Sequence, residues 1–62
     1  MNADLIAIQR INIMVQRNEL NVKKSRLKMK LKLAKDLAYA NAVTERIEHI
    51  DQELKDLDGL IN

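Results

Sequence analysis

The sequence predicts an all-α fold: an antiparallel helical hairpin that dimerises into a helical bundle or a coiled-coil-like assembly. Pro is absent and Gly59 is the only Gly, so the residues that form the turns of a sheet protein are scarce. Apolar residues recur at heptad spacing in the second half of the chain, and a second apolar stripe runs along the first segment. Sixty-two residues allow a single domain.

The length of the chain predicts self-association. A domain this small buries too little apolar surface to outweigh comfortably the conformational entropy lost on folding. Disulfides, metals or association usually close that gap. There is no Cys and His49 is the only His, so one chain offers neither a disulfide nor a thiolate or multi-His metal site. We therefore expect a homo-oligomer, with no metal and no cofactor.

The first helix is expected over about residues 3–19. Ile8, Ile11, Val15 and Val22 fit an a/d pattern in which Asn18 occupies the missing d position. We interpret Asn18 as the end of this helix. The alternative is that it is a buried polar residue, which fixes the register of a coiled coil at some cost in stability. Neighbouring apolar residues widen the stripe, as is typical of a helix that contacts two others in a bundle.

The connection is placed within residues 18–26, where Asn18, Asn21 and Ser25 are the turn-compatible residues. The second helix would then span about residues 26–59, be nearly twice as long as the first and overhang it. Two alternatives stay open: one continuous helix, or a turn near residues 30–36 between helices of equal length. The alternation of Lys with apolar residues over 26–33 also fits a strand, but Leu, Lys and Met favour a helix.

The second helix carries the clearest pattern, an unbroken a/d series at spacings of three and four. Such a series predicts an interaction seam with gentle left-handed supercoiling. The intervening residues are mostly charged and give a polar opposite face. The seam consists of Ala40, Val43, Ile47, Ile50, Leu54, Leu57 and Ile61. We expect Ile47, Ile50, Leu54 and Leu57 to be its anchors.

Charge is segregated along the chain. Residues 1–22 are neutral overall, residues 23–35 carry +7 and residues 36–62 carry −5, which together give the net charge of +2. We call residues 23–35 the basic segment. Its cations, which are candidates for electrostatic contact with Lys28, Lys30 and Lys32 foremost, are Lys23, Lys24, Arg26, Lys28, Lys30, Lys32 and Lys35.

Four interpretations of the basic segment are open. It can be a solvated face, or it can pair with the acidic C-terminal half of another antiparallel chain and so set register. It can also neutralise the phosphates of a nucleic acid, or lie on an anionic membrane surface. The preference for Lys over Arg and a single aromatic residue, Tyr39, argue against base recognition, and the absence of Trp and Phe argues against a membrane.

Two resemblances bear on the fold. The stretch Asp51-Gln52-Glu53-Leu54 partly resembles the Ser-Gln-Glu-Leu-Asp motif of a family of small hairpin phosphatases. Asp51 replaces the motif's Ser and Lys55 replaces its final Asp, so the resemblance does not imply phosphatase activity here. The size and helix layout are also similar to the plasmid-encoded Rop type of dimeric hairpin, although no motif is shared.

These observations predict a small non-enzymatic interaction protein, acting as a regulator, inhibitor or adaptor through helix-face binding to a protein partner and through self-association. The alternative is a nucleic-acid-binding hairpin that uses the basic segment. The sequence offers few residues for a catalytic nucleophile–base pair, because it has a single His and no Cys. We expect a cytoplasmic protein, since Cys is absent and no uncharged apolar stretch approaches 18 residues.

Overall fold

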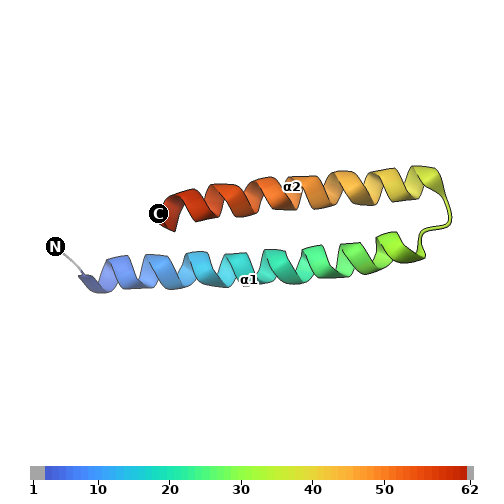
Figure 1. Ribbon diagram of the computed structural model, residues 1–62. Coiled ribbons are helices and arrows are strands. Elements are labelled where there is room, and N and C mark those ends of the chain that lie inside the picture. Colours follow the sequence, from blue (N-terminus) through green and yellow to red (C-terminus); the bar gives the residue numbers. More distant parts are fainter. Residues whose placement is uncertain (1–2, 62) are drawn as a thin grey trace.

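Two antiparallel α-helices form the structure, a computed structural model that describes residues 3–61 of the chain and the side chains of residues 4–60. Helix α1 spans Ala3–Leu33 and helix α2 spans Leu37–Ile61. They lie side by side along most of their length and are joined at one end by a short loop (Figure 1). The predicted helical hairpin is confirmed, and its dimerisation stays a prediction.

The turn lies at residues 34–36, and its placement within residues 18–26 was wrong. Asp36 caps α2: its side-chain Oδ1 accepts a hydrogen bond from the Ala38 amide at 3.2 Å, and its carbonyl accepts the first helical bond, from Ala40, at 2.9 Å. At the other side of the loop, the Ala34 amide donates to the Leu31 carbonyl at 3.2 Å and tightens the end of α1. The alternative turn near residues 30–36 agrees with the structure in position, although the two helices are not of equal length.

The region first assigned to the connection is continuous helix. Asn18, Asn21 and Ser25 all lie on exposed positions of α1. Each costs only about 0.5 kcal/mol relative to Ala in a helix interior, too little to break a helix that packs along most of its length. The first helix does not end near Asn18 as predicted, and residues 26–33 are helical rather than a strand.

The second helix was predicted to be the longer one, and this prediction was also wrong. Helix α1 has 31 residues and α2 has 25, so the first helix is the longer one by about 9 Å. The N-terminal end of α1 extends beyond the end of α2 (Figure 1). Gly59 lies inside α2, which continues to Ile61.

The interface between the helices is a single heptad seam from each of them. On α2 the least exposed residues are Val43 and Ile50, and Ala40, Ile47, Leu54 and Leu57 are half-buried. The side chain of Ile61, the last residue of the predicted seam, lies outside the described side chains. On α1 the half-buried positions recur at spacings of four and three: Ile13, Arg17, Leu20, Lys24, Leu27 and Leu31.

Two of these α1 seam positions are cationic, and each meets an acid of α2. Arg17 Nε lies 3.2 Å from Asp58 Oδ1, and Lys24 Nζ lies 2.5 Å from Asp51 Oδ1. The two cations are seven residues apart, as are the two acids, which fixes the antiparallel register of the hairpin. The acidic C-terminal half therefore lies along the neutral and basic parts of its own chain.

The molecule is a thin rod of 54 × 15 × 11 Å. Its radius of gyration is 15.3 Å, whereas a compact chain of this length has about 10.5 Å. Its accessible surface is 5282 Å², against about 4,100 Å² for a compact folded protein of this mass. Only Val43 and Ile50 are buried among the described side chains, so the hairpin has little core and an excess of surface.

Candidate interaction surfaces

A row of exposed apolar residues runs along α1 and is the first candidate surface. Its members recur at spacings of three, four and seven, with Asn18 and Ser25 at the two intervening positions. They are between 48% and 65% exposed. We call this row the outer stripe, and it consists of Ile8, Ile11, Val15, Val22 and Met29.

The outer stripe lies on the side of α1 that faces away from α2. Val22 is two residues from both Leu20 and Lys24 of the inner seam, which places it about 200° around the helix from each. No rotation of α1 can therefore turn both rows toward the same neighbour. The stripe continues toward the hairpin tip, where Leu33 and Leu37 are 77% and 75% exposed.

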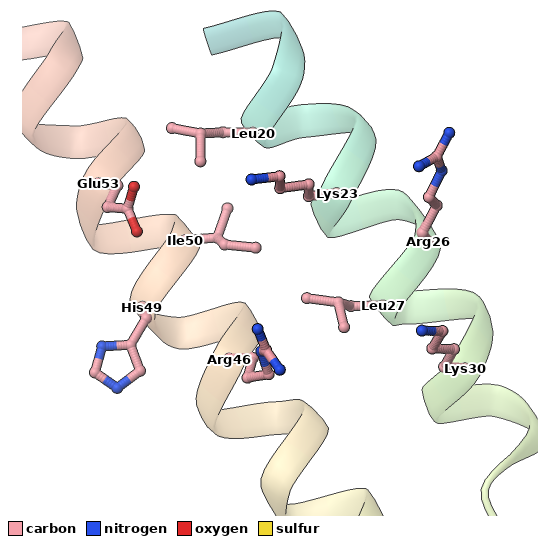
Figure 2. A pocket seen from close by; sticks show the side chains of 9 residues that line it. All are labelled: Leu20, Lys23, Arg26, Leu27, Lys30, Arg46, His49, Ile50 and Glu53. Carbon is pink, nitrogen blue, oxygen red and sulfur yellow. The ribbon is translucent and has the colours of Figure 1, made fainter. Parts of the chain in front are cut away.

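An open groove along one side of the interhelical seam is the second candidate surface, with a volume of about 520 Å³. Leu20, Leu27 and Ile50 point into the space between the helices and form its apolar floor (Figure 2). Polar and charged side chains form the rim, and Figure 2 shows Lys23 extending toward α2 and Arg46 toward α1. The rim residues are Lys23, Arg26, Lys30, Arg46, His49 and Glu53.

The rim of the groove is mostly cationic, since Glu53 is its only acid. The apolar floor removes water from one side of these charges, which strengthens their interaction with an anion relative to bulk solvent. Arg26 and His49 point away from the facing helix in Figure 2 and lie at the outer margins of the groove. The groove fits an elongated anionic ligand with apolar groups along one side.

The structure distributes the predicted contact residues over several places. The seam of α2 faces α1 of the same chain, so Ile47, Ile50, Leu54 and Leu57 lie within the hairpin. Their predicted role as anchors for a partner is not tested by this placement, although Ile50, at 8% exposed, has little surface left for one.

The basic segment is also divided by the helix. Lys24 enters the seam, and Lys23, Arg26 and Lys30 line the groove. Lys28 and Lys32 lie about 160–200° around α1 from Lys30, because alternate residues of a helix point to different sides. Lys28, Lys30 and Lys32 therefore do not form one contact surface.

The residues of the inner seam of α1 were not predicted to form a separate row. Their heptad spacing was present in the sequence, but Arg17 and Lys24 occupy two core positions and interrupt the apolar series. The outer stripe, which is apolar at more of its positions, was therefore the more visible pattern. Arg46 was counted only within the net charge of the C-terminal half, yet it faces the basic segment across the groove.

Two further findings concern the described part of the chain alone. Among its residues, no three His, Cys, Asp or Glu side chains gather as they would around a metal ion. Neither α1 nor α2, within those residues, combines the length and apolar character that crossing a membrane requires.

Comparison with known proteins adds no family to this description. A scan against protein-family models gives no match, and neither a curated protein nor a solved structure matches the chain.

Proposed function

We propose that this chain is a small non-enzymatic interaction protein that self-associates and binds a protein partner through the faces of its helices. The outer stripe carries the proposal. Five apolar side chains at heptad spacing remain about half exposed or more on a side of α1 that its own chain leaves uncovered. Such a row is the seam by which one helix packs against another, and burying it in a neighbour gains roughly 25 cal/mol per Å² of apolar surface.

The groove supports the second part of the proposal, binding of a protein partner. Its apolar floor and cationic rim complement an amphipathic helix whose apolar stripe is flanked by Asp and Glu. Lys23, Lys30 and Arg46 would contact the acidic flanks of such a helix. Charges at a rim act on the rate of association and on specificity more than on affinity.

Sedimentation equilibrium of the purified chain tests self-association. We expect the wild type to sediment as a dimer or a larger oligomer at micromolar concentration, and the variant Val15→Asp with Val22→Asp to sediment as a monomer. Asn41→Asp is a control for the effect of an added acid, because it lies at an exposed position on the outer side of α2. A wild-type monomer that unfolds cooperatively would refute the proposal.

A nucleic-acid-binding hairpin is the second candidate function, and the groove is the observation that favours it. It brings Arg46 of α2 beside Lys23, Arg26 and Lys30 of α1, which concentrates four cations along one side of the rod. A backbone that runs along this side would place several phosphates near these groups. Phosphate contacts of this kind give binding that is strongly salt-dependent and largely independent of sequence.

Fluorescence anisotropy distinguishes the two occupants of the groove. The probes are an acidic amphipathic peptide, a DNA duplex and a structured RNA, each titrated between about 50 and 200 mM salt. We expect Lys23→Glu with Lys30→Glu to abolish binding of the peptide. Lys28→Glu with Lys32→Glu changes the net charge equally, but on another side of α1, and should retain most of the binding. Tight, steeply salt-dependent binding of the nucleic acids alone would favour the second candidate.

A further inference from the structure

We infer that the partner of the outer stripe is the outer stripe of a second copy, with the two α1 helices antiparallel. The inference rests on the proposed function, because it requires self-association, and it adds the interface and the orientation. The α1 helices would form the centre of a four-helix assembly, and each α2 would lie on the outside. Three observations support it: the surface of the hairpin, the charge along α1 and the position of Asn18.

The surface of the hairpin provides the area that such a contact needs. Its 5282 Å² exceeds the surface of a compact protein of this mass by about 1,200 Å². A stable interface of standard size removes about 800 Å² from each partner. The outer stripe spans 21 residues between Ile8 and Met29, or about 31 Å of helix, which is long enough for a contact of that size.

Charge along α1 selects the antiparallel orientation. In a parallel pair, the basic segment of one copy, with its seven cations and no acid, would run beside the basic segment of the other. Repulsion between them would act within the screening length of about 8–10 Å. In an antiparallel pair, each basic segment lies beside the neutral first part of the partner. Asp4, in the first turn of α1, then comes opposite the last turn of the partner's helix, where Lys30 and Lys32 lie.

Asn18 provides the third observation. It is exposed, and it lies in the row between Val15 and Val22, close to the midpoint of the stripe between Ile8 and Met29. In an antiparallel pair, the midpoint coincides with the two-fold axis, so the Asn18 side chains of the two copies come close to each other. Two such amides can donate to and accept from each other, and a polar pair inside an apolar seam selects one register over others.

Disulfide trapping tests the orientation, and the chain offers a clean background because it contains no Cys. The variants are Ile8→Cys, Asn18→Cys and Met29→Cys, in a glutathione redox buffer, with Glu48→Cys on the outer side of α2 as the control for random collisions. We expect Asn18→Cys to cross-link with itself. Ile8→Cys and Met29→Cys should not cross-link with themselves, because the two copies of each would be about 31 Å apart, but they should cross-link with each other when mixed.

Zero-length carbodiimide cross-linking of the wild-type protein provides a second measurement that needs no substitution. We expect a bond between the Asp4 carboxyl and the amine of Lys30 or Lys32. These groups are about 40 Å apart along one helix, so this bond can form only between two copies. Peptide mapping by mass spectrometry identifies it, and isotope-mixed dimers verify that it is intermolecular.

The outcomes separate the inference from the function on which it rests. Self-cross-linking of Ile8→Cys and of Met29→Cys in a dimeric protein would overturn the antiparallel orientation and leave self-association intact. Trapping at the level of Glu48→Cys for every variant, with a dimeric mass and no Asp4 cross-link, would overturn the outer stripe as the interface. A wild-type monomer would overturn both.

Discussion

At the scale of single residues, Asp36 decides where the chain turns. Residues 23–33 form one uninterrupted helical run of good helix formers with a single Ser, and nothing before Ala34 stops it. Asp36 then offers an oxygen to the Ala38 amide and so satisfies one of the donors that every helix leaves free at its start. The end of α1 is complementary, because Lys30 and Lys32 lie near the negative pole of that helix.

Asp36→Ala should therefore destabilise the hairpin. We expect the free energy of unfolding to fall by about 1 kcal/mol, because the cap of α2 is lost while the helix remains. Urea denaturation followed by circular dichroism measures the change. Asp36→Ser keeps a capping oxygen and should restore most of the loss, and an Asp36→Ala variant as stable as the wild type would show that the cap does not hold the turn.

Asn18 is the residue whose role differs most between the single hairpin and the inferred dimer. In the hairpin it is an exposed polar residue of little consequence, whereas in the inferred dimer it lies at the axis. Asn18→Leu should tighten association by about tenfold or more, since another apolar side chain is buried, and should relax the orientation of the helices.

Combining Asn18→Leu with Ile8→Cys makes that relaxation visible. Self-cross-linking of Ile8→Cys, absent in the wild-type background, should rise once the polar pair is gone. Asn21→Leu, on a flank of α1 outside the stripe, is the control and should leave the pattern unchanged. Tighter association with an unaltered cross-linking pattern would mean that charge alone sets the orientation.

At the scale of the helices, α1 and α2 differ in how many neighbours they are built for. Helix α2 has one apolar seam, which faces α1, and a polar outer side. Helix α1 has apolar residues on two opposite sides, and α2 covers only one of them. A helix with two apolar sides is typical of the inner position in a bundle, which places α1 between its own α2 and another chain.

One truncation in the interhelical seam and one in the outer stripe should distinguish the stability of the hairpin from the stability gained by association. Ile50→Ala leaves a cavity inside the seam, and we expect it to lower the free energy of unfolding by about 2–4 kcal/mol at any protein concentration. Val22→Ala, on the outer stripe, should change stability only at concentrations where the oligomer forms. Denaturation at two concentrations distinguishes them, and equal, concentration-independent losses would count against an outer interface.

At the scale of the whole molecule, the hairpin is elongated and has almost no interior. Two ion pairs help to hold its register, but both join partly exposed groups, and pairs of that kind contribute about 0.2–1 kcal/mol each. Burial along a single seam must supply most of the stability, and such a seam is short of the area that larger domains bury. Association would add a second seam of similar length.

Thermal unfolding should therefore depend on protein concentration. For a folded dimer that dissociates as it unfolds, a tenfold increase in concentration should raise Tm by about 5 °C for a chain of this length. Differential scanning calorimetry across two decades of concentration measures the shift. An invariant Tm would indicate that the hairpin folds alone.

Much of the architecture could be predicted from particular residues. The absence of Pro and the spacing of Val43, Ile47 and Ile50 predicted helices and the apolar side of the second one. The turn could not be placed, because Asn18 and Asn21 carry the same local preferences as turn residues, and the preferences differ by only about 0.5 kcal/mol. Packing along a helix of 31 residues outweighs them.

The candidate surfaces were only partly predictable. The outer stripe was visible as a pattern, but the sequence could not tell whether it faced the partner helix or the solvent. The groove could not be foreseen, because Arg46 and Lys23 are distant in the chain and come to line one groove only when the turn is fixed at residues 34–36.

By itself, the sequence determined that the chain is helical, that α2 has one apolar side and that opposite charges occupy different parts of the chain, because these properties depend on neighbours within a few turns. The tertiary structure decided which of the two apolar rows of α1 is covered. The physical reason for this choice is the register of the two helices. Asp36 and the ion pairs Arg17–Asp58 and Lys24–Asp51 fix that register. That register brings the row containing two cations against the acidic helix and leaves the more apolar row outside.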